Sequence, residues 1–392
     1  MRIAVLTTYF TPNRSSAAVQ VHDLAAEILR QGHKPTVLVP NADMDEPFRH
    51  IVIDGIDVVQ LKSPPFQNIS YIRRTLNEAI MPWCMYRNLT RSPFSDVQWD
   101  KVVWYSPSIF LAPIVAYMKR KSGCRSYMIM RDIFPEWALD LGLMRKGVAY
   151  WIFRAIAAYQ NSVANVIGVQ APGELPYFRD RIRPDQSVEV LHNWLSEPVY
   201  GGCSIDVSKT HLAGRKIFVY AGNIGISQGA DTLLTLAQSL KEHADIGLIF
   251  IGRGSDKARL EKAAYNDNLD NVMFYSEIDP SEIPGLYVQC HAGIVILDPR
   301  HTTHNIPGKF ISYVKCGLPV LASVNYGNDL NGIIVDNNVG EICKDNTVDS
   351  LRQATLTLCD KIEQDSEISM RCKVLGKELF SSQGAVEQIL KG

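Results

Sequence analysis

Three glycines lie in one short loop in the second half of the sequence. Gly222, Gly225 and Gly229 separate an apolar run at 216–221, which predicts a strand, from helical spacing at 231–243. In such a loop the backbone N–H groups can surround a phosphate at the start of the helix. Glycine is also common there simply because it shapes the turn. The loop predicts a phosphate site, with a purely structural turn as the alternative.

A second glycine pair follows the next apolar run, at 246–251. Gly252 and Gly254 permit a close approach of a ligand, and Arg253 between them is placed to meet a phosphate. The alternative is a tight turn with a solvated arginine.

The loop from Asp298 to Lys309 is the most informative. Pro307 is well placed to begin a helix, so Lys309 falls in its first turn. A lysine there opposes the helix dipole, which is easier to understand if the side chain faces an anion. His301 and His304 suggest a metal pair, but beyond Asp298 no third ligand stands nearby, so we expect no metal.

In the first half of the chain, charged residues follow an apolar run at 127–130. Arg131, Asp132 and Glu136 stand where a parallel strand would end, which is where acid, base and substrate-binding groups belong. Asp132 and Glu136 are the candidates for acid or base chemistry. The alternative is a simple ion pair between Arg131 and Asp132.

The loop after the first apolar run, at 2–9, ends in polar residues. Arg14, Ser15 and Ser16 come just ahead of a predicted helix at 17–30, so they suit contact with a phosphate or an acceptor, or they only cap the helix. The loop has no glycine, whereas a dinucleotide site needs GxGxxG there. This argues against an NAD or FAD enzyme.

These loops fit an α/β fold of two consecutive Rossmann-like domains with parallel sheets. Apolar, β-rich runs alternate with helical spacing, and the pattern restarts after a polar stretch at 197–215. We assign 1–200 to an N-terminal domain, 215–372 to a C-terminal domain, and 373–392 to a C-terminal helix that can pack back on the first domain. Since ligands bind beyond the carboxyl ends of parallel strands, we expect the site in a central cleft between the two facing sheets.

The bulk composition excludes several classes of protein. Of the 392 residues, 46% are hydrophobic and 21% charged, which suits large cores rather than disorder. The formal net charge of −1 argues against a nucleic-acid-binding protein. The eight cysteines are spaced too widely for zinc-ligand pairs. No apolar stretch suits a signal peptide or a membrane span, so we expect a soluble, cytoplasmic protein.

Two segments of the first domain, 71–94 and 144–159, mix basic residues with apolar and aromatic ones. Interfacial helices use this combination against anionic lipid, although an ordinary amphipathic helix with solvated arginines gives the same pattern. The residues are Arg73, Arg74, Arg87 and Arg91 with Ile72, Met81, Trp83 and Tyr86, and then Arg145, Lys146 and Arg154 with Trp151 and Phe153.

Six short segments of the chain form a familiar set that spans about residues 1–340. Together they resemble the retaining GT-B glycosyltransferases of family 4, most closely those of bacterial surface-polysaccharide synthesis. The nearest subgroup is the N-acetyl-L-fucosaminyltransferases of O-antigen assembly. The segments are Gly32–His33, Arg131–Trp137, Leu191–Trp194, Tyr220–Gly225 with Gln228 and Gly229, Phe250–Gly254, and Asn305–Pro319.

The resemblance implies that the second domain binds a nucleotide-sugar donor and the first domain the acceptor, with no catalytic metal or other cofactor. Protein groups would then neutralise the charge that develops on the leaving diphosphate. Catalytic roles would fall to Asp132, Glu136, Arg253 and Lys309. Donor contacts would come from Gly222, Asn223, Gly225, Gln228, Arg253, His304, Asn305, Pro307, Gly308, Lys309 and Ser312, and acceptor contacts from Arg14, Ser15, Ser16 and Arg131.

The sequence departs from this family at two places. His304 and Ser312 stand where the family has two glutamates, which contact the donor sugar and the ribose. Asn223 and Gln228 stand where it has an arginine and a lysine. The phosphate charge would therefore fall more heavily on the remaining arginine, the remaining lysine and the backbone.

The leading hypothesis is a hexosyltransferase bound peripherally to the cytoplasmic face of the inner membrane. It would move a sugar such as L-FucNAc from a UDP-sugar to a polyprenyl-diphosphate-linked saccharide in O-antigen, capsule or other surface-polysaccharide biosynthesis. One alternative is a GT-B-fold UDP-sugar epimerase, which shares the phosphate loops but needs no acceptor. Another is an inactive nucleotide-sugar-binding protein, for which the missing glutamates argue.

Overall fold

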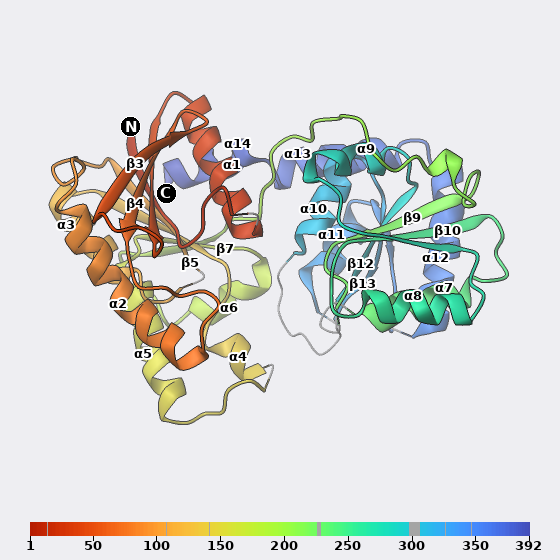
Figure 1. Cartoon of the computed structure of the whole chain (residues 1–392), viewed down its shortest axis with the longest axis horizontal. Coiled ribbons are helices and arrows are strands. Elements are labelled where there is room, and N and C mark those ends of the chain that lie inside the picture. The colour runs from red at the N-terminus through yellow and green to blue at the C-terminus, as the bar shows by residue number, and fades with distance from the viewer. Residues whose placement is uncertain are drawn as a thin grey trace. The chain divides into compact units, whose positions relative to one another are not determined.

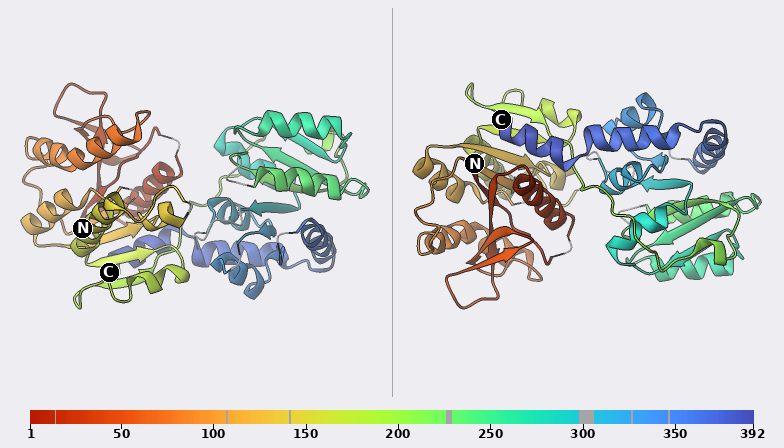
Figure 2. Two further views of the ribbon diagram at one scale, coloured as in Figure 1. Left: turned by 90° about the horizontal axis from the view of Figure 1, so that it is seen from below. Right: turned by 90° about the horizontal axis from the view of Figure 1, so that it is seen from above.

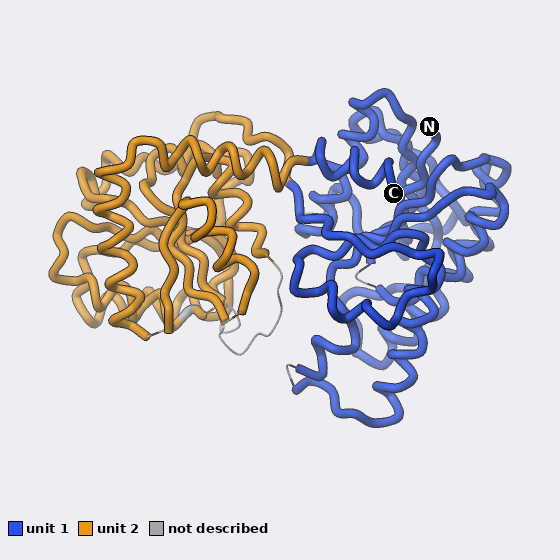
Figure 3. Tube along the Cα trace, turned by 180° about the vertical axis from the view of Figure 1, so that it is seen from behind, with its two compact units in different colours: residues 1–194, 382–392 blue, residues 195–381 orange. Residues whose placement is uncertain are grey.

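The computed structural model describes residues 1–13, 15–106, 108–140, 142–225, 229–297, 306–325, 327–345 and 347–392. The chain divides into two compact units, shown in different colours in Figure 3. The first contains residues 1–194 and 382–392, and the second contains residues 195–381. Each unit is an α/β domain built on its own sheet, so the predicted fold class is confirmed.

The described part of the first unit contains a sheet of eight strands in the order β3-β4-β2-β1-β5-β6-β7-β8. Neighbouring strands are parallel except β3 and β4, which form an antiparallel hairpin that the sequence analysis missed. Asp54 and Gly55 turn this hairpin with φ of 52° and 78°. The strands are β1 (Arg2–Leu6), β2 (Lys34–Asn41), β3 (Phe48–Ile53), β4 (Ile56–Lys62), β5 (Lys101–Ser106), β6 (Arg125–Met130), β7 (Val166–Val169) and β8 (Ser187–Val190).

Helices cover both faces of this sheet, and a hydrophobic cluster lies on each side. One cluster includes Val21, Leu24 and Ile28 of α1 with Val386 of α14, and these two helices lie side by side in Figure 2. The other cluster lies under α2, α3 and α5. The helices are α1 (Ser16–Arg30), α2 (Tyr71–Leu89), α3 (Ala112–Ser122), α4 (Glu136–Asp140), α5 (Val148–Val163), α6 (Leu175–Phe178) and α14 (Ser382–Lys391).

The second unit has six described strands, all parallel, in the order β11-β10-β9-β12-β13-β14. Helices again cover both faces (Figure 1). The strands are β9 (Lys216–Ala221), β10 (Ile246–Ile251), β11 (Val272–Tyr275), β12 (Ala292–Ile296), β13 (Val320–Ser323) and β14 (Gly340–Ile342). The helices are α7 (Ala230–Ser239), α8 (Lys257–Asn266), α9 (Ile283–Tyr287), α10 (Gly308–Lys315), α11 (Asp329–Asp336), α12 (Val348–Gln364) and α13 (Ile368–Leu379).

The expected boundaries between the units need two corrections. The stretch at 197–215, interpreted as a linker, belongs to the second unit because Ile205, Val207 and Leu212 are buried in its core. The side chain of Gln289 also holds this stretch, accepting from Val207 N at 2.9 Å and donating to Ile205 O at 2.9 Å.

The C-terminal segment, predicted as one helix over 373–392, consists of parts of two helices. α13 stays with the second unit, and α14 belongs to the first. The buried ammonium of Lys101 at the start of β5 donates to Ile389 O at 2.7 Å and to Leu390 O at 3.0 Å. A cation at a helix C-terminus satisfies the last carbonyl groups, which explains why α14 ends against this sheet.

Candidate functional site: the carboxyl edges of the two sheets

The glycine loop after β9 packs backbone to backbone against the loop after β10. Gly222 N donates to Ile251 O at 2.9 Å, and Ile224 N donates to Arg253 O at 2.8 Å. Gly252 has φ of 147°, and a Cβ there would lie 1.9 Å from the carbonyl oxygen of Gly222. The glycines are therefore required for this loop pairing, and the N–H of Gly222 is engaged by it rather than aimed at a ligand.

Lys309 extends from the first turn of α10 to this loop. Its Nζ donates to the hydroxyl of Tyr220 at 2.8 Å and lies 4.0 Å from the centre of the Tyr220 ring. A Cβ on Gly222 would lie 3.6 Å from Lys309 Cε, so the lysine stem lies beside the glycine backbone. The Tyr220 hydroxyl in turn donates to Asn223 O at 2.8 Å. One phenol thus connects the lysine to the glycine loop.

Burial lowers the pKa of the Lys309 ammonium to about 7. Burial also raises the pKa of Tyr220, so the phenol stays protonated and can donate to the loop. A partly buried lysine held by a neutral phenol gains most when an anion approaches, because the anion restores the charged state. This arrangement suits the binding of a phosphate group beside Gly222.

At the start of α10, Pro307 is the N-cap, and a Cβ placed on Gly308 would meet no atom of the described residues within 4 Å. The rest of the helix is held against strand β9. Tyr313 donates to Val219 O and accepts from Ala221 N, both at 3.1 Å, so its ring ties α10 to the end of β9. The predicted residues Pro307, Gly308 and Lys309 therefore stand at a rigidly held helix end.

Three other predicted donor residues have different surroundings. The side chain of Arg253 is 82% exposed, and its Nε lies 3.4 Å from Glu277 Oε2. The exposed side chain of Arg253 agrees with the alternative of a tight turn with a solvated arginine. The Ser312 hydroxyl forms a hydrogen bond with the buried phenol of Tyr287 on α9. Asn223 is exposed on the glycine loop.

Arg131, at the end of β6 in the first unit, lies in a network of amide side chains. Its Nη1 donates to Gln20 Oε1 at 2.7 Å and to Asn193 Oδ1, and its guanidinium lies 5.7 Å from the centre of the Tyr105 ring. Tyr105 also donates to Gln20 Oε1, at 2.6 Å. These bonds fix the guanidinium against the framework and leave its neighbour Asp132 exposed at the same edge.

Glu136 is the first residue of α4. Its Oε1 accepts from the Tyr177 hydroxyl at 3.0 Å. Its Oε2 is buried and has no hydrogen-bond partner in the part of the chain that the structure describes. A buried carboxylate oxygen without a donor is costly, so a hydrogen-bond donor from a ligand would be favourable here.

Ser15 has the capping role that sequence reasoning left open. It is the N-cap of α1, and its Oγ accepts from Ala18 N at 3.3 Å. Ser16 is the first helical residue and is exposed. Four further predicted contacts, Arg14, Gln228, His304 and Asn305, lie outside the described residues, as do Asp298 and His301. Among the described residues no group of three His, Cys, Asp or Glu side chains could hold a metal ion.

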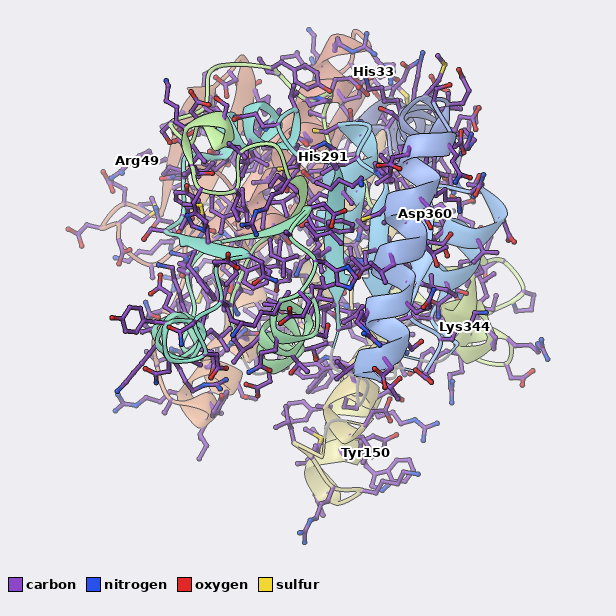
Figure 4. All side chains as sticks on the ribbon, turned by 90° about the vertical axis from the view of Figure 1, so that its right-hand side faces the viewer. His33, Arg49, Tyr150, His291, Lys344 and Asp360 are labelled. Atoms are coloured by element: carbon purple, nitrogen blue, oxygen red, sulfur yellow. The ribbon has the colours of Figure 1, made fainter. Side chains whose placement is uncertain are left out.

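Large apolar side chains are exposed on α2 and at the start of α5. On α2, Ile72 is 76% and Trp83 62% exposed; on α5, Val148 is 78% and Trp151 54% exposed. The segment around Tyr150 projects from its unit in Figure 4. Both helices begin after strands of the parallel sheet, so their first turns lie at the same edge as Arg131. Within the described residues no helix is long and apolar enough to span a membrane.

Sequence reasoning missed several polar residues at these two edges. Tyr220 and Asn193 were noted only as parts of motifs, and Gln20 was not singled out at all. Glu174 is a further example, because burial raises the pKa of its carboxyl to about 7 although Gln170 N and Ala171 N both donate to it. Nothing in the local sequence signals Gln20 or Tyr220, because their partners Arg131 and Lys309 are distant in the chain.

Comparison with known proteins identifies the chemistry. Residues 205–373, which make up most of the second unit, match the family described as Glycosyl transferases group 1. The chain is also 22% identical over 367 residues to glycosyltransferase WbjE of Pseudomonas aeruginosa, covering 92% of this chain and 90% of WbjE. The chain is a glycosyltransferase. A second relative, the colanic acid biosynthesis glycosyl transferase WcaI of Escherichia coli (strain K12), is 25% identical over 227 residues, or 56% of each chain.

Solved structures show that this glycosyltransferase has the GT-B fold. HepE of Anabaena in complex with UDP superposes with a TM-score of 0.68 at 15% identity, covering 100% of this chain and 99% of HepE. WaaG, a glycosyltransferase involved in lipopolysaccharide biosynthesis, gives a TM-score of 0.68 at 14% identity, covering 99% of this chain and 100% of WaaG. At these identities the similarity establishes the two-domain fold and not the substrate.

Proposed function

We propose that this glycosyltransferase uses a UDP-sugar as donor and binds its diphosphate at the edge of the second sheet formed by Gly222, Tyr220 and Lys309. The observation that carries the proposal is Lys309, whose ammonium lies partly buried against a neutral phenol and a glycine backbone. A diphosphate bound there would restore the charge of Lys309. The charged ammonium would then stabilise the leaving diphosphate without a metal ion. HepE, a protein of the same fold, has been solved with UDP, which supports this nucleotide.

The first unit would bind the acceptor at the edge that carries Asp132 and Glu136. Asp132 is exposed, and the amide network around Arg131 fixes the strand end that presents it. Glu136, whose buried Oε2 has no hydrogen-bond partner among the residues that the structure describes, is suited to accept a hydrogen bond from an acceptor hydroxyl. A retaining outcome, as the resemblance implies, is part of this proposal.

The pathway we propose is the synthesis of O-antigen, capsule or another surface polysaccharide. The name of WcaI places it in colanic acid biosynthesis, and WaaG is involved in lipopolysaccharide biosynthesis. We propose an N-acetylated deoxy sugar such as L-FucNAc as the sugar moved, and a saccharide linked to polyprenyl diphosphate as the acceptor.

Such an acceptor would be reached at a membrane, and we propose that α2 and the start of α5 lie on the cytoplasmic face of the inner membrane. Ile72, Leu76, Ile80 and Trp83 recur at intervals of three and four residues, so they form one exposed apolar stripe along α2. The exposed Arg73 and Arg87 flank it. Basic residues each add about 1 kcal/mol of attraction near an anionic surface.

The direct test of transfer is incubation of the protein with a panel of UDP-sugars and GlcNAc linked through diphosphate to a short polyprenol. We expect a disaccharide-lipid with one donor, and equal rates with and without EDTA. Loss of all transfer in EDTA, or no transfer with any donor, would contradict the proposal. Epimerisation of UDP-GlcNAc in the absence of acceptor, followed by NMR, would instead identify the epimerase.

Membrane association is tested by co-sedimentation with vesicles that contain anionic phospholipid. We expect the double variant Trp83→Ala/Trp151→Ala to bind at least tenfold more weakly, because it removes two exposed aromatic side chains. Tyr265→Ala is the matched control, because Tyr265 is 84% exposed but lies in the second unit. Equal binding by all three proteins would contradict this surface.

A further inference from the structure

Helix α2 has two opposite faces of different chemistry. Arg74, Glu78, Met81 and Met85 fall on one side of the helix, and the last two are buried in the core. The exposed apolar stripe around Leu76 lies on the other side. No residue of the first ten in α2 is fully buried, so this half of the helix extends past the core. Its inner face is therefore partly accessible to solvent.

The inner face meets three loops at the carboxyl edge of the sheet. Arg74 Nε donates to Glu78 Oε1 at 2.7 Å, and the Ser108 hydroxyl, from the loop after β5, donates to Glu78 Oε2 at 3.0 Å. Tyr9, from the loop after β1, lies close enough that the charges of Arg74 and Glu78 both act on the pKa of its phenol, which burial raises. Phe66, from the loop after β4, packs edge-on against the Tyr9 ring at 5.9 Å.

These side chains differ in burial, with Glu78 and Ser108 shielded from solvent and Arg74 and Tyr9 accessible to it. Ser108 is 4% exposed, and the side chain of Glu78 is 13% exposed, whereas the side chain of Arg74 is 49% exposed and Tyr9 is partly exposed. A carboxylate and a guanidinium next to an aromatic ring offer acceptors and donors for neighbouring hydroxyls and an apolar face for a pyranose ring. The paired charges cancel, so the site favours a neutral sugar over a diphosphate.

We propose that Tyr9, Arg74, Glu78 and Ser108 form a subsite for the sugar ring of the acceptor. This inference rests on the proposed transfer to a lipid-linked saccharide and names residues that recognise the saccharide. The same helix then serves both parts of the acceptor, because its outer face contacts lipid and its inner face contacts sugar. The two are separated by one helix diameter, about 10 Å.

The experiment measures binding of GlcNAc linked through diphosphate to a short polyprenol, by calorimetry and without donor. Glu78→Gln keeps the shape of the side chain and removes its charge, and we expect at least tenfold weaker binding of this probe. Ser108→Ala and Tyr9→Phe should each weaken binding about threefold to tenfold. UDP affinity and the melting temperature should stay unchanged, a result that a purely structural role of Glu78 would not give.

Glu27→Gln is the matched control, because Glu27 on α1 is equally a shielded carboxylate bonded to an arginine, Arg30, at 2.6 Å and 2.7 Å. We expect it to bind the probe as the wild type does. Equal binding by wild type and Glu78→Gln, or no binding by the wild type, would overturn the subsite. Binding that is lost in Glu78→Gln, with no transfer from any donor, would sustain the subsite and contradict only the proposed transfer.

Discussion

The two sheets each present a cation at their carboxyl edge, and the two cations are held in opposite ways. Arg131, in the first unit, is bonded to the amide oxygens of Gln20 and Asn193 and stacked near an aromatic ring. Lys309, in the second unit, donates to the hydroxyl of Tyr220 and lies against its ring. The first cation is built into the framework, whereas the second is held where a ligand can still change its charge.

This difference suggests different functions for the carboxyl edges of the two sheets. A guanidinium stays protonated in any surroundings, so it suits a fixed structural position. Burial lowers the pKa of an ammonium, and it brings the pKa of Lys309 to about 7. The second unit can thus respond to the charge of a diphosphate, while the first presents a fixed surface to an acceptor. Four predictions test this contrast.

The largest effect should come from Lys309→Ala. We expect kcat/KM for transfer to fall by roughly 100-fold to 1000-fold, because a charged donor to the leaving group is lost. UDP binding should weaken by about 1.5–3 kcal/mol. Steady-state kinetics and calorimetry measure the two quantities. Lys241→Ala, which removes a surface lysine bonded to Asp267 O, is the control and should leave both unchanged.

Arg131→Met should instead affect stability. The change removes the Arg131 donor to the amide oxygen of Asn193 and one of the two donors to that of Gln20, which keeps the Tyr105 hydroxyl. We expect a cost of about 1–3 kcal/mol. Calorimetry should show a lower melting temperature for the first unit and an unchanged affinity for UDP. Arg120→Met, on the exposed side of α3, should change neither. Weaker UDP binding without loss of stability would break the contrast.

The pH dependence of donor binding should follow Lys309. Diphosphate binding favours the charged ammonium, so it raises the pKa of Lys309 in the complex. Above pH 7 binding must then take up a proton, and affinity falls as pH rises through the pKa of the free protein. We expect roughly 20-fold weaker binding of a UDP-sugar at pH 8.5 than at pH 6.5. In Lys309→Arg the profile should be flat, because arginine stays charged.

The smallest effect should come from Tyr220→Phe. The variant keeps the ring and removes the hydroxyl that bonds Lys309 and Asn223 O, so UDP affinity should fall by about 1 kcal/mol. In Lys309→Ala the same change should have no further effect, which a double-mutant cycle would show. Additive effects of the two changes would mean that the phenol acts independently of the lysine.

The local pattern of the sequence was enough to predict fully buried strands. Lys216–Ala221 and Ile246–Ile251 have the predicted bounds, because fully buried parallel strands are continuous apolar runs. The hairpin of β3 and β4 was missed although Asp54 and Gly55 signal it, since β3 at the sheet edge is only partly buried.

Lys309 was predicted from its position in a helix first turn, which is a local signal. The features that depend on distant residues could not be predicted. The return of α14 to the first sheet rests on Lys101, which is 288 residues from its partner Ile389. The Gly222 N–H is engaged because two loops pair with each other. Glu78 accepts a hydrogen bond from Ser108, which is 30 residues away in the chain.

The central claim is that Lys309 is the group that responds to the donor's diphosphate. Its titration can be followed by NMR of protein labelled with ¹³C at lysine Cε, with Lys309→Arg to assign the signal. We expect a midpoint near pH 7 in the free protein, and a midpoint at least two units higher with UDP bound. An ordinary midpoint near 10.4 in the free protein, or one that UDP does not move, would contradict the account.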